Sequence, residues 1–101
     1  MSLLELSPDA ARERVTHGAV LIDVRQAHER AGGMAEGARG VAMATLLADP
    51  TAHLPRRDQA IVLICQSGRR SMEAAILLAR LGYTRIASVH GGTTAWRAEG
   101  L

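Results

Sequence analysis

The sequence predicts an α/β fold, with a parallel sheet that carries helices on both faces. The short apolar run at 20–24, rich in β-branched residues, is typical of a strand buried on both faces, and we predict two further strands at 60–64 and 85–89. Segments with helical patterns lie before, between and after these strands, and Gly18 and Gly82 end two of them. Strands that alternate with helices favour a parallel sheet, whose ligands bind at the carboxyl ends of the strands.

The length and the cysteine content place the chain in a broad class. Its 101 residues fit one domain over residues 1–101, long enough to bury about 60–70% of its unfolded surface. The single cysteine excludes disulfide-stapled secreted scaffolds and dithiol redox motifs. Residues 1–6 lack the features of a signal peptide, and the longest apolar run, 74–79, is too short to span a bilayer. We therefore expect a cytoplasmic protein that does not bind membranes.

Two absences exclude further functions. The chain has no lysine, which excludes a pyridoxal phosphate Schiff base and a phosphate-binding loop ending in Gly-Lys-Ser/Thr. Its twelve basic residues, all arginines, are scattered apart from the pairs at 56–57 and 69–70, and Tyr83 and Trp96 are the only aromatic residues. With a net charge of only +2, this pattern does not favour a nucleic-acid partner.

The elements of the N-terminal half follow in order. Ser7 followed by Pro8 is typical of a helix N-cap with proline at the first helical position, and we expect this helix to run to about His17. After the first strand, we expect a short helix at 27–31 followed by a loop, a short strand at 41–43, a short helix at 45–49 that ends before Pro50, and an exposed connection at 51–58.

The C-terminal half begins with the clearest central strand, 60–64, which runs into Cys65. A turn at 66–70 and a helix at 71–81 follow. Only Glu73 and Arg80 mark a narrow polar stripe on this helix, so we expect it to pack against the sheet and a second element. The chain then forms the strand at 85–89, a turn at 90–92 and a helix at 93–99 anchored by Trp96.

Cys65 lies where a buried strand meets a glycine-containing turn and a helix. Such a turn aims backbone N–H groups inward as an anion-binding nest, and the helix N-terminus adds about half a positive charge. Arg69 and Arg70 add more positive charge, so the thiol should ionise readily and act as a nucleophile. A structural cysteine needs neither Gly68 nor these arginines, so we predict a functional thiol.

Two other classes of cysteine enzyme fit less well. The loop of a tyrosine phosphatase reads His-Cys-x5-Arg, whereas here Ile64 precedes the cysteine and Arg70 comes one residue early. The tighter loop suits a sulfur atom on Cys65 better than a tetrahedral phosphate. Papain-like hydrolysis needs a histidine base, and no motif supplies one. The four histidines show no metal-ligand spacing, so we expect no metal; His90 follows a strand and is either a loop residue or a neighbour of the site.

Three motifs then carry a family resemblance. The first joins Leu21-Ile22-Asp23-Val24-Arg25 to Glu29 and 33–38, the second is Cys65-x-x-Gly68-x-Arg70-Ser71, and the third is Gly91-Gly92-x-x-Ala95-Trp96. In this order and at these separations, the chain resembles a single-domain rhodanese, a sulfurtransferase, over nearly its whole length. The resemblance implies a rhodanese-like three-layer α/β/α fold with a central, mostly parallel sheet of about five strands. Met34 and Arg30 stand where the family usually has a histidine and an aromatic residue, which leaves the pocket shape and the acceptor open.

The resemblance also implies a mechanism without a cofactor. The Cys65 thiolate would take a sulfur atom from thiosulfate or a similar donor as a persulfide, and cyanide, a thiol or an acceptor protein would then remove it. The partners would be a small sulfur-containing anion and a sulfur-donor or acceptor protein. The alternative function is a persulfide carrier without turnover, or a rhodanese-like protein-binding module; a small phosphatase or arsenate reductase is disfavoured by the short loop.

The resemblance assigns roles to the remaining site residues. Arg25 matches a substrate-facing arginine, and the alternative is a salt bridge that orients the loop, with Asp23 and Glu29 as structural partners for such arginines. Arg70 closes the loop and pairs with a carboxylate or with the sulfur anion, whereas Arg69 faces solvent and attracts anions. We thus predict Cys65 as the catalytic residue, with a substrate-binding set made up of Arg25, Gln66, Ser67, Gly68, Arg69 and Arg70.

Overall fold

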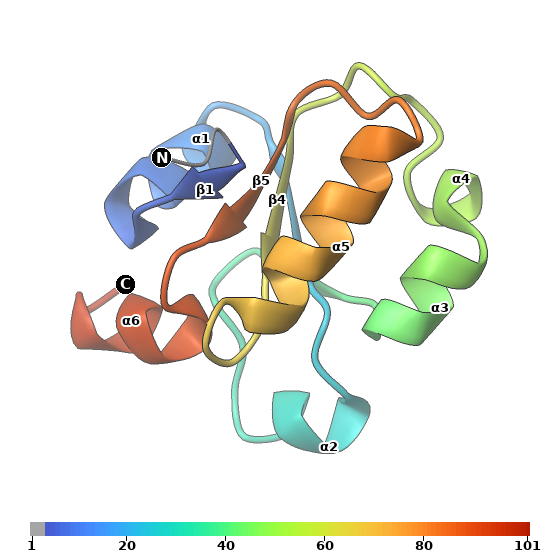
Figure 1. The fold of residues 1–101 in the computed structure, drawn as a ribbon. Helices are drawn as coiled ribbons and strands as arrows, with labels where there is room; N and C mark the ends of the chain where they lie inside the picture. Colours follow the sequence, from blue (N-terminus) through green and yellow to red (C-terminus); the bar gives the residue numbers. More distant parts are fainter. Residues whose placement is uncertain (1–3) are drawn as a thin grey trace.

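The computed structural model describes residues 4–101, which form an α/β fold around one five-stranded sheet (Figure 1). The strand order is β1-β5-β4-β2-β3, and every neighbouring pair is parallel. The predicted fold class is therefore confirmed. The prediction about a signal peptide falls partly on residues 1–3, outside the described residues. The strands are β1 (Glu5–Leu6), β2 (Val20–Asp23), β3 (Arg39–Gly40), β4 (Ile61–Ile64) and β5 (Ile86–Val89).

Helices cover both faces of the sheet, with α1 and α6 on one side and α3, α4 and α5 on the other (Figure 1). As predicted, Ser7 caps the first helix, and its side-chain oxygen accepts from the amide of Ala10 at 3.2 Å. Within residues 4–101, no helix has the length and apolar character needed to cross a membrane. The helices are α1 (Pro8–Thr16), α2 (Ala27–Arg30), α3 (Met43–Ala48), α4 (Pro50–His53), α5 (Arg69–Arg80) and α6 (Gly92–Ala98).

The alternation of side chains along the strands divides the core into two layers. Ile61 and Leu63 of β4 pack with Leu78 on the α5 side, whereas Val62 and Ile64 pack on the other side. Because successive strand residues point to opposite faces, both faces of β4 need apolar residues, which explains its unbroken run. The next residue along, Cys65, falls on the α5 side, and this parity places the thiol under the start of that helix.

The N-terminal half differs from the prediction in three details. The structure has a two-residue edge strand, β1, that the sequence analysis did not predict. The short strand lies at Arg39–Gly40 and not at 41–43, because the amide of Met43 bonds to Val24 and already begins α3. The connection predicted at 51–58 contains α4, which starts at Pro50 because proline suits the first turn of a helix.

The helix after the cysteine also differs from the prediction. It begins at Arg69, two residues early, because Gly68 adopts a left-handed conformation and caps it. Its solvent-facing side is wider than the predicted stripe, since Ile76 and Leu77 are 36% and 42% exposed. The opposite side packs on the sheet and on α3, in agreement with the prediction of two packing partners.

A buried tyrosine ties the segment before β4 to the end of α5. The Tyr83 hydroxyl donates to the carbonyl of Leu54 at 2.6 Å, and the side chain is buried. We expect Tyr83→Phe to lower the free energy of unfolding by about 1–2 kcal/mol, because the buried carbonyl loses its donor. Urea unfolding measures this change. The control is Thr84→Ala, which removes an exposed hydroxyl 3.4 Å from its acceptor; an equal effect of both variants would contradict the prediction.

Candidate active site

Cys65 follows directly on β4, at the carboxyl end of the central strand, and is 1% exposed. The loop that follows turns sharply into α5 because Gly68 has a φ of +95°, which only glycine adopts readily. A Cβ atom at Gly68 would also lie 3.1 Å from the Val89 carbonyl oxygen. The loop thus packs against the end of β5, and this holds its backbone N–H groups toward the sulfur.

Three donors converge on the Cys65 Sγ atom. The amide of Gly68 lies 3.1 Å from it, and the amide and hydroxyl of Ser71 lie at 3.4 and 3.3 Å. These groups come from the loop and the first turn of α5, where amides have no helical partner. The arrangement replaces the water that a thiolate would otherwise need.

These contacts favour the charged form of the sulfur. Burial by itself raises the pKa of the Cys65 thiol, but the hydrogen bonds from the Ser71 hydroxyl and from the amides of Ser71, Gly68 and Ser67 outweigh it. The net pKa of the thiol lies below its ordinary value. The side chain is therefore prepared as a nucleophile.

Several hydrogen-bond donors at residues 69 and 70 have no acceptor within the described part of the chain. Within residues 4–101, the amides of Arg69 and Arg70 donate to no other group, and the exposed side chain of Arg69 has no hydrogen-bond or ion-pair partner. Ser67 is exposed at the tip of the loop, and its amide faces the sulfur. An anionic group arriving at Cys65 would thus meet unpaired N–H groups.

Arg25 is buried and fully paired. Its guanidinium donates to both carboxylate oxygens of Asp23, the shortest contact being 2.8 Å, and to the carbonyls of Glu29 and Gly33. The remaining donor bonds to the Gln66 side chain at 3.2 Å. All five N–H groups are used within the protein, so this geometry favours the loop-orienting alternative over direct contact with substrate.

Arg70 pairs with a carboxylate. Its two terminal nitrogens bind the two oxygens of Glu29 at 2.7 and 2.8 Å, and this bidentate contact joins α5 to α2. The Arg70 hydrogen bonds, together with one from the amide of Gln26, lower the pKa of Glu29 to about 2. Of the two partners expected for Arg70, the structure shows the carboxylate.

The start of α6 also holds the loop in place through hydrogen bonds. The sequence analysis did not predict these contacts. The amide and the hydroxyl of Thr93 both donate to the Cys65 carbonyl, at 2.8 and 2.9 Å. Thr94 accepts from the Gln66 side chain at 2.9 Å, so Gln66 bridges Arg25 and α6. The signal was present in the Gly91-Gly92 motif: a Cβ atom at Gly92 would lie 2.5 Å from the Cys65 carbonyl oxygen.

The comparisons with known proteins agree with this geometry. Residues 7–99 match the family described as the rhodanese-like domain. The chain belongs to this family. A sulfurtransferase from Allochromatium vinosum is 32% identical over 96% of this chain and 91% of its own length, and the thiosulfate sulfurtransferase GlpE from Ectopseudomonas mendocina is 33% identical over 92% and 84%. The solved human single-domain sulfurtransferase TSTD1 superposes with a TM-score of 0.84 at 28% identity, over 97% of this chain and 98% of that one. These relatives support a sulfurtransferase activity.

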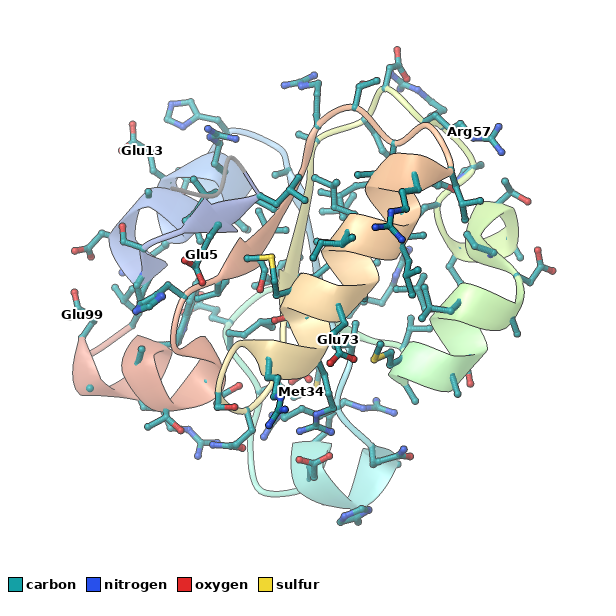
Figure 2. All side chains as sticks on the ribbon, in the orientation of Figure 1. Glu5, Glu13, Met34, Arg57, Glu73 and Glu99 are labelled. Carbon is teal, nitrogen blue, oxygen red and sulfur yellow. The ribbon has the colours of Figure 1, made fainter. Side chains whose placement is uncertain are left out.

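Two positions noted for this rhodanese-like chain lie outside the loop. The side chain of His90 is exposed and lies 3.1 Å from Glu5 of the edge strand β1, and no hydrogen bond joins it to Cys65. Met34 is 37% exposed and is labelled in the lower part of Figure 2, between the start of α5 and α2. The carbonyl of its neighbour Gly33 accepts a hydrogen bond from Arg25, so Met34 lies next to a residue that positions the loop.

The close approach at Gly92 makes a sharp prediction. We expect Gly92→Ala to lower the free energy of unfolding by about 2 kcal/mol or more, because the new methyl group would overlap the loop carbonyls. Thermal or urea unfolding measures this. Gly37→Ala is a matched control, since Gly37 also has a positive φ, +85°, but a Cβ atom there would lie 4.0 Å from its nearest neighbour, a Val15 methyl group. An equal loss at both positions would show that backbone conformation alone, and not the contact, is responsible.

The Glu29–Arg70 pair predicts a dependence of stability on pH. A carboxylate whose pKa is depressed on folding stabilises the protein above its unfolded pKa, about 4.3, and loses this contribution as the pH falls toward 2. We expect Glu29→Gln to destabilise the protein at pH 7 and to lose most of this effect near pH 2. Urea unfolding of both proteins from pH 7 to pH 2 measures the difference, and a difference independent of pH would contradict the assignment.

Proposed function

We propose that this protein is a sulfurtransferase that moves a sulfane sulfur from thiosulfate, or a similar donor, to a nucleophilic acceptor through a persulfide on Cys65. The observation that carries the proposal is the set of donors around one buried sulfur, at 3.1–3.4 Å, with unpaired amides beside it. The thiosulfate sulfurtransferase relatives support the choice of donor. The free cysteine, which must stay reduced to act, supports a cytoplasmic location.

In the first step, the Cys65 thiolate attacks the outer sulfur of thiosulfate. A bond forms between Sγ and that sulfur, the sulfur–sulfur bond of thiosulfate breaks, and sulfite leaves with the electron pair. The free amides of Arg69 and Arg70 are suited to hold the incoming anion and then the terminal sulfur of the persulfide. The exposed, unpaired Arg69 side chain attracts the donor by its charge.

In the second step, the acceptor attacks the terminal sulfur. With cyanide, a carbon–sulfur bond forms, thiocyanate leaves, and the electron pair of the broken sulfur–sulfur bond returns to Sγ. The same donors that stabilise the resting thiolate then stabilise Sγ as the leaving group. The two steps form a ping-pong cycle in which Cys65 begins and ends as a thiolate.

The residues in and around the loop divide into two groups in this proposal. Gly68 and Ser67 offer backbone donors to the sulfur, and the Arg69 side chain attracts the anion. Arg25, Gln66 and Arg70 position the loop, since their side chains bond to protein groups on both sides of it. Loss of one of these side chains should therefore misplace the loop rather than remove a contact with the donor.

The test is to incubate the protein with thiosulfate and cyanide and to measure thiocyanate, beside Cys65→Ser. We expect turnover by the wild type and a loss of at least about a thousandfold in Cys65→Ser, because a serine hydroxyl stays protonated near neutral pH and is a weak nucleophile. Intact-mass spectrometry after thiosulfate alone should show a gain of about 32 Da, one sulfur atom, that cyanide removes.

Activity that survives Cys65→Ser would overturn the mechanism. A stable persulfide without thiocyanate would favour the carrier function, and the absence of both would favour a binding module. Thr45→Ser is a suitable control variant for expression and handling, because Thr45 is an exposed residue of α3 and lies outside the loop. It should keep the wild-type turnover.

A further inference from the structure

A second buried hydroxyl lies behind the sulfur-binding group. Ser88 is in β5, pairs in register with Leu63 of β4, and is 0% exposed. Burying a hydroxyl among apolar strand residues is costly unless it is hydrogen-bonded. Its oxygen lies 2.7 Å from the Ser71 hydroxyl oxygen and 3.5 Å from the Gly68 carbonyl, so both of its contacts lead to the residues that hold Cys65.

The direction of these hydrogen bonds follows from the number of protons. When Cys65 is a thiolate, it accepts the Ser71 hydroxyl proton over 3.3 Å. The 2.7 Å contact between the two serines must then use the Ser88 proton, because Ser71 has only one. The chain therefore runs from Ser88 to Ser71 to the sulfur. When Cys65 is a neutral thiol, the order of donors can reverse: Ser71 then donates to Ser88, and Ser88 donates to the Gly68 carbonyl. This last contact, at 3.5 Å, is longer and weaker.

We propose that Ser88 is a positioning residue for sulfur transfer: its hydroxyl orients and polarises the Ser71 hydroxyl so that Ser71 donates to the sulfur of Cys65. The inference deepens the proposed sulfurtransferase function and rests on it. A series of hydrogen bonds that ends on the negatively charged sulfur is stronger than the reversed series, which ends on the Gly68 carbonyl. Ser88 thus favours the thiolate over the thiol, although it does not touch the sulfur.

The two ion pairs beside the loop lie outside this chain of hydrogen bonds. Arg70 is paired with Glu29, and Arg25 is paired with Asp23. Neither ion pair has a hydrogen bond to Ser88. The contacts of the Ser88 hydroxyl are with the Ser71 hydroxyl and the Gly68 carbonyl. Removal of the Ser88 hydroxyl therefore tests the relay while both ion pairs stay in place.

The test uses the rate of alkylation of Cys65 by iodoacetamide as a function of pH. The chain has one cysteine, so the rate reports a single thiolate. The four proteins are the wild type, Ser88→Ala, Ser71→Ala and the double variant, each first shown by urea unfolding to be folded. We expect Ser88→Ala to move the pH midpoint upward and to slow alkylation at pH 7 roughly threefold, the effect of one weakened hydrogen bond. Ser71→Ala should have a larger effect.

The double variant decides between a relay and a structural role. If Ser88 acts through Ser71, then Ser88→Ala has no further effect on the pH midpoint in the Ser71→Ala background. Ser88→Thr, which keeps the hydroxyl, should restore the wild-type midpoint. An unchanged midpoint in Ser88→Ala, or equal shifts in both backgrounds, would overturn the inference. Because alkylation needs no sulfur donor, this result is independent of whether thiosulfate is turned over.

Discussion

A buried sulfur anion has to be surrounded by donors that replace water, and the loop after β4 together with the first turn of α5 meets that requirement at Cys65. Cys65 is almost fully covered, yet the pKa of its thiol lies below the ordinary value because hydrogen bonds from the Ser71 hydroxyl and from loop amides outweigh the effect of burial. Those donors belong to a loop that must reverse direction within a few residues and then begin a helix. The left-handed Gly68 makes the reversal, and α5 supplies amides without helical partners.

Each side of the loop is bonded to a different element of the fold. Arg70 binds Glu29 of α2, Arg25 links β2 to Gln66, and Thr93 of α6 holds the Cys65 carbonyl. These ties come from segments far apart in the sequence, which meet only because the parallel strands bring their carboxyl ends to one edge of the sheet. The relay through Ser88 adds a tie from β5 beneath the loop.

Much of this could be predicted from local patterns. The unbroken apolar run before Cys65 predicts a buried strand, and the glycine between that strand and a helical pattern predicts a turn at a helix start. The two short edge strands could not be predicted from local patterns, because pairing with a neighbouring strand defines them. β1 has only two residues and is a strand because it pairs with β5, and the position of β3 follows from its register with β2. The apolar surface of α5 was overestimated as core because helical periodicity does not reveal which flank a neighbour covers.

The sequence by itself predicted the fold class and singled out Cys65 and the loop that follows it, because these predictions depend on residues adjacent in the chain. Only the tertiary structure decided which partners the arginines and the serines have. A guanidinium at position 25 could face substrate or protein, and it faces protein because Asp23, Gly33 and Gln66 surround it with acceptors. Ser88 reads as an ordinary strand residue; it acquires a chemical role because the parity of β5 turns its hydroxyl toward Ser71.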